Sequence, residues 1–239
     1  MSRRTVLITG ANRGIGHATA KKFLSAGYNV IATARNENDI KNLKEEGFHS
    51  FSLDVCNDES IDDLFSHLKL KNITIDVLVN NAGLSQVSLF SKITNESWNS
   101  IINTNLTSIF KISQKVIRSM SKNGFGRIIN ISSVLSVMPQ KGFSHYSTSK
   151  AGMEGLTRSL ALEYAAKGVT VNCIAPGFVD TDMLDCLGEQ GKKMMGSSIP
   201  VGYAAHPDDI ADLVLFIGSP NSRYITGETI NINGGLNFR

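Results

Sequence analysis

A tyrosine and a lysine stand four residues apart in the string YSTSK at positions 146–150. That spacing places Tyr146 and Lys150 on one face of a helix, about one turn apart. A tyrosine hydroxyl has an ordinary pKa of about 10 and exchanges protons poorly at neutral pH. Because a nearby ammonium favours the phenolate, we expect Lys150 to lower the pKa of Tyr146, so that the pair can transfer protons.

A serine hydroxyl stands at the end of the apolar run that precedes this pair. Ser133 closes the string NISS at 130–133. Its hydroxyl would hold a carbonyl oxygen beside the Tyr146 hydroxyl, where the two groups stabilise the negative charge that develops on that oxygen. A tyrosine and a lysine at this spacing are frequent by chance. Ser133 and the motifs described below favour a catalytic role for the pair.

A glycine-rich string, TGANRGIG at 9–16, follows one apolar run and precedes a segment of helical period. Glycines let a backbone turn tightly, and the free N–H groups of a helix N-terminus attract phosphate. The spacing differs from the G-x-G-x-x-G fingerprint, and no Gly-Lys-Ser or Gly-Lys-Thr string follows as in a P-loop. Its place between the first strand and the first helix predicts a dinucleotide site rather than an ordinary turn.

Two arginines predict which dinucleotide binds. An acidic residue at the end of the second strand would bind the ribose hydroxyls of NAD, whereas arginine would meet the 2′-phosphate of NADP. The sequence has no carboxylate there but has Arg35, and Arg13 lies in the glycine turn. Two guanidinium groups on one phosphate make strong charge-assisted bonds, so we expect NADPH, with solvated surface arginines as the alternative. Asp54, at the end of the third strand, is placed to accept from the adenine amino group.

Short apolar runs that alternate with longer helical segments must position these residues. The strand candidates are Thr5–Thr9, Asn29–Ala34, Ser50–Leu53, Asp76–Asn80, Arg127–Ile131, Thr170–Ala175 and Thr229–Ile232. The helix candidates are Ile15–Ala26, Glu37–Glu46, Glu59–Leu68, Glu96–Lys122, Tyr146–Lys167 and Pro207–Gly218. Continuous apolar runs are typical of parallel strands covered on both faces, and the strand–helix–strand order implies right-handed crossovers. The sequence predicts an α/β Rossmann-type domain, with a doubly wound parallel seven-stranded sheet and helices on both faces.

One stretch interrupts the alternation. Residues 182–205 carry several glycines and methionines after a strand end, which predicts a mobile lid over the site, with a surface helical hairpin as the alternative. No linker divides the chain, so we expect residues 1–239 to form a single dinucleotide-binding catalytic domain.

Composition and charge exclude several classes of protein. Hydrophobic residues make up 41% and charged residues 19% of the chain, and the net charge of +3 is scattered, unlike a nucleic-acid-binding surface. No secretory leader and no run of about 18 apolar residues occurs, so we expect no membrane span. The separated cysteines Cys56, Cys173 and Cys186 indicate reduced thiols and a cytoplasmic protein. The sequence has no HExxH motif and no cluster of Cys and His residues, so we expect no catalytic metal.

Together these motifs resemble the short-chain dehydrogenase/reductase family over essentially the whole chain. The strings are TGxxxGIG at 9–16, NNAG at 80–83, Asn105, Ser133, Tyr146 with Lys150, and Pro176-Gly177. The resemblance implies Ser133, Tyr146, Lys150 and Asn105 as catalytic residues, with Asn105 holding a water in a proton relay to Lys150. It also implies that the positive ring of an oxidised nicotinamide favours the Tyr146 phenolate. The cofactor-binding residues that follow are Gly10, Asn12, Arg13, Gly14, Ile15, Gly16, Arg35, Asp54, Val55, Asn81, Ala82, Gly83, Tyr146, Lys150, Pro176, Gly177, Val179 and Thr181.

Within this family, three strings resemble the 3-oxoacyl-[acyl-carrier-protein] reductases. They are TNLTSIF at 104–110, APGFVDTDM at 175–183, and YITGET at 224–229 with NGG at 233–235. The implied reaction is NADPH-dependent reduction of a β-keto thioester to the 3-hydroxyacyl product.

Other substrates stay open. The string LSQVSLF at 84–90 replaces a charged one in those relatives, and of two positions matched to basic carrier-docking residues beside the active site, Lys167 is basic but Gly124 is not. The alternatives are an acetoacetyl-CoA reductase, an alcohol or hydroxysteroid-type dehydrogenase, and a non-catalytic NADPH sensor. A complete set of catalytic residues counts against the sensor.

The resemblance also implies a homotetramer. Residues 96–122 and 146–167 carry more apolar residues than one sheet-facing stripe needs. Relatives use these two helices, and the C-terminal segment around Gly234-Gly235-Leu236, in contacts between subunits.

His145 is expected to face solvent just before a helix, with tuning of the pocket as the alternative.

Overall fold

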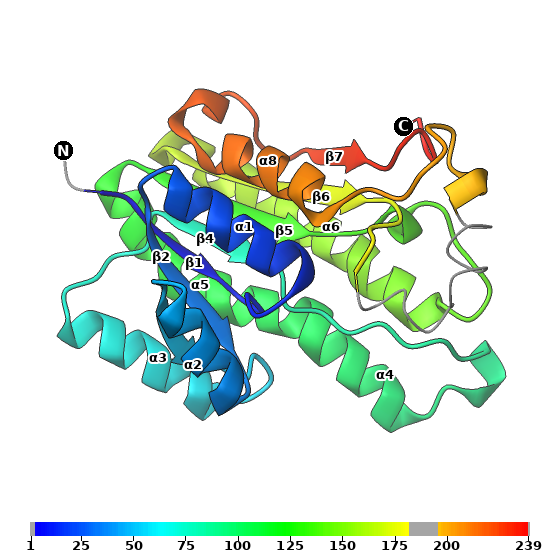
Figure 1. Cartoon of the computed structure of the whole chain (residues 1–239), viewed down its shortest axis with the longest axis horizontal. Helices are drawn as coiled ribbons and strands as arrows, with labels where there is room; N and C mark the ends of the chain where they lie inside the picture. The colour runs from blue at the N-terminus through cyan, green and yellow to red at the C-terminus, as the bar shows by residue number, and fades with distance from the viewer. Residues whose placement is uncertain (1–2, 182–195, 239) are drawn as a thin grey trace.

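A parallel sheet forms the centre of the protein. The computed structural model describes residues 3–181 and 196–238. Its sheet has seven strands, in the order β3-β2-β1-β4-β5-β6-β7 (Figure 1). The strands are β1 (Thr5–Ile8), β2 (Asn29–Ala34), β3 (His49–Ser52), β4 (Val77–Asn80), β5 (Gly126–Ile131), β6 (Val169–Pro176) and β7 (Thr229–Ile232). Every neighbouring pair is parallel, which confirms the predicted sheet.

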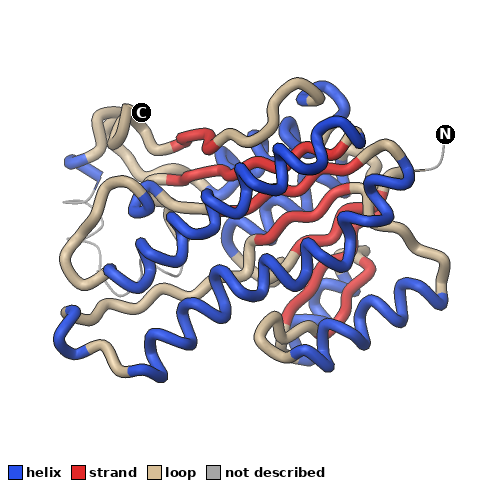
Figure 2. Tube along the Cα trace, turned by 180° about the vertical axis from the view of Figure 1, so that it is seen from behind, coloured by secondary structure: helices blue, strands red, loops and turns tan. Residues whose placement is uncertain are grey.

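Helices cover both faces of this sheet. One layer contains α1 (Gly14–Ser25), α2 (Glu37–Glu45) and α8 (Pro207–Gly218). The other contains α3 (Asp58–Leu70), α5 (Ser108–Asn123) and α6 (Ser144–Tyr164), with α4 (Asn95–Ile102) leading into α5. Seen from behind, long helices of the second layer lie in front of the strands and run in roughly the same direction (Figure 2). The predicted doubly wound arrangement is confirmed.

Alternating strand residues feed two separate cores. In β1, Val6 and Ile8 pack in the cluster that includes α1 and α8, while Leu7 packs in the cluster that includes α3 and α5. All three are fully buried. Because both faces of each central strand are covered, the strands read as continuous apolar runs in the sequence.

The predicted helix Glu96–Lys122 is interrupted. A π-helical turn, Asn103–Thr107, separates α4 from α5. Such turns widen the hydrogen-bond ladder by one residue and occur often at functional sites. This one holds Asn105 in a position that helical periodicity alone does not predict. Another boundary also differs, since α6 begins at Ser144 rather than at Tyr146.

The two described ends of the long excursion after β6 meet each other. Val179 forms a parallel bridge with Ala205, and Asp180 N donates to Ala205 O at 2.8 Å. Residues 182–195 lie outside the described residues, so the lid at 182–205 stays a prediction.

No helix among the described residues is long and apolar enough to cross a membrane. No group of three or more His, Cys, Asp or Glu in the same ranges could hold a metal ion.

Candidate active site

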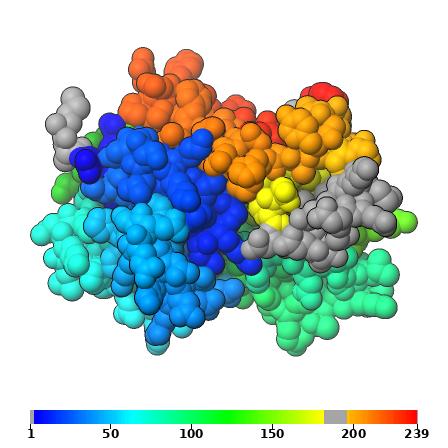
Figure 3. Space-filling view, in the orientation of Figure 1, coloured from blue at the N-terminus to red at the C-terminus, as the bar shows by residue number. Residues whose placement is uncertain are grey.

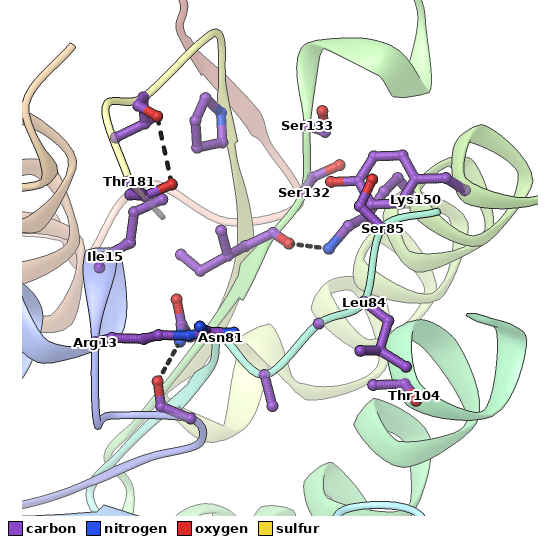
Figure 4. Close-up of a pocket in the computed structure, with 18 of the residues that line it drawn as sticks. Arg13, Ile15, Asn81, Leu84, Ser85, Thr104, Ser132, Ser133, Lys150 and Thr181 are labelled. Carbon is purple, nitrogen blue, oxygen red and sulfur yellow. Dashed lines mark hydrogen bonds between the residues drawn. The ribbon is translucent and has the colours of Figure 1, made fainter. Parts of the chain in front are cut away.

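A cavity of about 980 Å³ opens at the carboxyl ends of the strands. In the space-filling view, the yellow segment after β6 lies between the blue N-terminal part and the orange part that leads into α8 (Figure 3). Figure 4 shows Arg13 and Asn81 on one side of the cavity and Ser133 and Lys150 on the other. All the residues predicted to bind cofactor line this cavity except Gly16. They come from the turn after β1, from the segments that follow β2, β3 and β4, from the end of β6 and the segment after it, and from α6. The fold therefore brings the glycine turn and the catalytic candidates to one site.

The glycine turn leaves the start of α1 open toward the cavity. Its N-cap residue, Arg13, makes no capping hydrogen bond through its side chain, and the first turn holds no acidic residue. Gly10 and Gly14 have φ values of +64° and +53°, which favour glycine. A Cβ on Gly10 would lie 3.1 Å from Ala82 Cα. Free N–H groups at a helix N-terminus and a backbone without side chains fit a phosphate group.

The turn is fastened to the loop after β4. The Asn81 side-chain amide donates to Thr9 O at 3.0 Å and to Gly10 O at 2.9 Å. In return, Thr9 Oγ1 accepts from the backbone N–H groups of Asn81 and Ala82, each at 3.0 Å. Four hydrogen bonds thus join two segments that are far apart in the sequence into one rigid wall.

Gly16 lies behind that wall instead of in the cavity. A Cβ there would stand 2.3 Å from Gly10 O and 2.4 Å from Asn81 Nδ2. These separations are too short for any side chain. Gly16 therefore lets α1 pack closely against the glycine turn and against the Asn81 side chain, whose hydrogen bonds clamp that turn to the loop after β4. Its contribution to cofactor binding is therefore indirect.

Both predicted phosphate-binding arginines line the cavity and are exposed to solvent. The Arg35 side chain makes no hydrogen bond or ion pair with another described residue. Asp54 also lines the cavity, and its Oδ1 accepts from Cys56 N at 2.9 Å, which closes the turn after β3. The second Asp54 oxygen takes no part in this turn.

An acidic residue that the sequence reading missed lies in the same region. Asp39, in the first turn of α2, lines the cavity and accepts from Asn12 Nδ2 at 3.0 Å and from Asn36 Nδ2 at 3.3 Å. Its position four residues after Arg35 was visible in the sequence. The contact with Asn12 was not, since it depends on how α2 folds against the glycine turn.

Ser133, Tyr146 and Lys150 share one wall of the cavity. Ser133 follows β5 and caps a short 3-10 turn, where its hydroxyl accepts from Leu135 N at 3.1 Å. On α6, Lys150 Nζ lies 5.6 Å from the centre of the Tyr146 ring and donates to Ile131 O at 2.7 Å. The helical spacing predicted for the tyrosine and the lysine is thus observed.

Burial shifts the pKa values of both groups. Desolvation raises the pKa of Tyr146, and its hydrogen bond with Ser133 acts in the opposite direction without cancelling that rise. The expected lowering by Lys150 is not found in the protein alone. Desolvation lowers the pKa of Lys150 to about 8. Tyr146 is therefore a neutral phenol at neutral pH, beside a lysine that is mostly protonated.

Asn105 is fully buried next to the cavity but does not line it. Its Oδ1 accepts from Leu84 N and its Nδ2 donates to Leu84 O, both at 2.8 Å, and Nδ2 also donates to Ser149 Oγ at 3.1 Å. These bonds occupy the side-chain amide and hold the loop after β4 against α6. A relay through Asn105 stays a prediction, and the side chain itself serves to position the loop.

His145 is not solvent-facing, so that expectation is wrong. Because α6 begins at Ser144, His145 already belongs to the helix and is fully buried. Desolvation lowers its pKa, and neither ring nitrogen has a hydrogen-bond partner among the described residues.

The two positions matched to carrier-docking residues do not flank the cavity of their own chain. Gly124 ends α5 with a φ of +67° just before β5, and Lys167 precedes β6, where its ammonium lies 4.8 Å from the centre of the Tyr164 ring. Both stand at the amino ends of strands, whereas the cavity lies at the carboxyl ends. The expectation that they lie beside the active site is wrong within one chain.

Comparison with known proteins agrees with this site. Residues 4–192 match the family model for short chain dehydrogenases. The chain is 42% identical over 236 residues to the 3-oxoacyl-[acyl-carrier-protein] reductase of Vibrio harveyi, with 98% of this chain and 97% of the relative covered. The reductase of the same name from Escherichia coli K12 is 39% identical over 236 residues, with the same coverage. A crystal structure of a proposed gluconate dehydrogenase from Agrobacterium tumefaciens superposes with a TM-score of 0.91 at 29% identity, covering 98% of this chain and 95% of that one. The chain belongs to the short-chain dehydrogenase/reductase family, whose members are NAD(P)-dependent oxidoreductases acting on CH–OH or C=O groups.

Proposed function

We propose that this protein catalyses the NADPH-dependent reduction of a β-keto thioester, of the 3-oxoacyl-acyl-carrier-protein type, to the 3-hydroxyacyl product. The observation that carries the proposal is the single cavity that joins an open phosphate-binding turn to Ser133, Tyr146 and Lys150. The relatives at about 40% identity are 3-oxoacyl-[acyl-carrier-protein] reductases, which supports the thioester substrate.

The cavity residues divide the work of binding. The glycine turn would hold the pyrophosphate, Asp54 the adenine, and Pro176, Gly177, Val179 and Thr181 the nicotinamide side. When bound, NADPH supplies the hydride that the keto carbon accepts. Arg13 and Arg35, exposed at the cavity rim, would bind the 2′-phosphate, which favours NADPH over NADH.

The proton steps follow from the burial of the catalytic residues. The neutral Tyr146 hydroxyl donates its proton to the substrate oxygen as the C–O bond becomes an alkoxide. Ser133 holds that same oxygen by a hydrogen bond. The resulting Tyr146 phenolate is stabilised by the neighbouring Lys150 ammonium, which resupplies the proton from solvent. Because the pKa of Tyr146 is not lowered, its hydroxyl keeps its proton at neutral pH and can donate it in the reductive direction.

The proposal extends to a cytoplasmic homotetramer. Phe110 on α5 and Leu162 on α6 are 49% and 87% exposed in the single chain, and Phe238 near the C-terminus is 88% exposed. A second and a third copy would cover these apolar side chains. Light scattering of the purified protein should give four times the chain mass. A monomer at micromolar concentration would contradict this part.

A substrate panel tests the main proposal. The rate of NADPH oxidation is measured with a β-ketoacyl carrier protein, with acetoacetyl-CoA and with free ketones, and repeated with NADH. We expect the highest kcat/KM with the carrier-bound thioester and NADPH. Faster turnover of a free ketone would favour an alcohol or hydroxysteroid-type dehydrogenase. Binding of NADPH without consumption in any mixture would favour a sensor.

A further inference from the structure

Helix α6 is fastened to the end of β5 at three consecutive residues. Thr157 Oγ1 accepts from Asn130 Nδ2 at 2.8 Å, and Lys150 Nζ donates to Ile131 O at 2.7 Å. The third bond runs from Ser132 Oγ to Glu154 Oε1 at 2.7 Å. Ser133 is the next residue along the chain. The tie through Glu154 therefore fixes the backbone that carries Ser133 relative to the helix that carries Tyr146.

Glu154 is an unusual residue for that role, because it is only 6% exposed. A carboxylate taken out of water needs a hydrogen bond and a nearby positive charge. Ser132 provides the hydrogen bond. Lys150, one turn earlier on the same helix, provides the positive charge, although its own hydrogen bond goes to Ile131 O.

The Glu154 carboxylate also has an electrostatic effect on Lys150. Among the described residues, the groups that raise the pKa of Lys150 against desolvation are Cys173 on β6 and Glu154 on α6. Burial raises the pKa of the Cys173 thiol to about 12, so it is neutral near pH 7. The positive charge of Arg158, further along α6, partly opposes the rise in the pKa of Cys173. The neighbouring Tyr146 is a neutral phenol and adds no charge. Within residues 3–181 and 196–238, Glu154 is thus the source of negative charge for the Lys150 ammonium.

We propose that Glu154 is a positioning residue for the reaction, which holds the end of β5 through Ser132 and supplies the negative charge that balances the buried Lys150 ammonium. The inference rests on Lys150 being the proton-supplying lysine of the proposed function. It requires no contact between Glu154 and either substrate or cofactor, and Glu154 does not line the cavity.

The first test is the pH dependence of kcat in Glu154→Gln. The amide oxygen still accepts from Ser132, while the charge is lost. The alkaline limb of the profile should move to lower pH by about one unit, since an opposite charge one helical turn away shifts a pKa by roughly that amount or more. Glu154→Asp keeps the charge and should leave the limb near its original position. Glu163→Gln, at an exposed position on the same helix, is the matched control and should leave the profile unchanged.

Ser132→Ala separates the two effects. It removes the hydrogen bond but keeps the carboxylate, so kcat should fall at every pH while the limb stays in place. A uniform loss of kcat in Glu154→Gln, with the limb unmoved, would overturn the electrostatic part of the proposal. Unchanged kcat in Ser132→Ala would overturn the positional part.

A stability measurement tests the same idea without substrate or cofactor. Lys150 has a lowered pKa in the folded state, so its ammonium costs stability below that pKa, and the cost disappears as pH rises and the lysine loses its proton. Removing the Glu154 charge increases the cost. The Tm deficit of Glu154→Gln should therefore be largest below pH 8 and narrow above it. A pH-independent deficit would overturn the inference, even if the substrate proposal failed for other reasons.

Discussion

Replacing Gly16 by alanine should destabilise the wall that the glycine turn and the Asn81 loop form, although Gly16 does not line the cavity. The added Cβ would lie 2.3 Å from Gly10 O and 2.4 Å from Asn81 Nδ2, about 1 Å inside ordinary contact. The turn or the Asn81 amide must move apart. Either movement stretches the two bonds of 3.0 and 2.9 Å from Asn81 Nδ2 to Thr9 O and Gly10 O.

The magnitude follows from those contacts. Losing two hydrogen bonds costs about 2 kcal/mol, and overpacking adds about 1–3 kcal/mol. The gain from replacing a helical glycine by alanine returns about 1 kcal/mol. The net loss is about 3 kcal/mol, which for a chain of this size lowers Tm by about 6–12 °C.

Thermal denaturation with and without NADPH measures both consequences. Besides the lower Tm, the displaced turn should weaken NADPH binding about tenfold, or about 1.4 kcal/mol, in a fluorescence titration. Gly155→Ala on α6 is the matched control, because no atom lies within 4 Å of its added Cβ. A Gly16→Ala variant with the Tm and the NADPH affinity of the original protein would refute the reasoning.

Three further predictions concern the proposed chemistry. Tyr146→Phe should lower kcat by about 10²–10⁴-fold with nearly unchanged NADPH affinity, as judged by steady-state kinetics and titration; near-normal turnover would remove Tyr146 as the acid. Arg35→Ala should raise the KM for NADPH about tenfold and leave the KM for NADH unchanged, and an equal change with both cofactors would argue against 2′-phosphate binding. Because Lys150 has a pKa lowered to about 8 and supplies the proton, the reduction rate should fall as pH rises through that value, and a flat rate across it would contradict the assignment.

The sequence predicts the fold and the catalytic spacing well because both depend on local periodicity. Continuous apolar runs specify buried parallel strands, and a separation of four residues fixes Tyr146 and Lys150 on one helical face. Contacts between distant segments are harder to predict. The clash that Gly16 avoids involves Asn81, and the π-helical turn that holds Asn105 breaks the period on which the helix prediction depends. Glu154 lies between these cases, since its spacing from Lys150 was visible but its burial was not.

The clamp between the glycine turn and the Asn81 loop has a consequence for how this protein can change over evolutionary time. Its four hydrogen bonds hold together the turn and the loop that we propose bind any dinucleotide, while Arg13 and Arg35 stand at the exposed rim. Substitutions at exposed positions typically change stability by less than about 0.5 kcal/mol. Cofactor preference can therefore be exchanged by point mutation at the rim, with no loss of the folded scaffold, and the two properties can be selected independently.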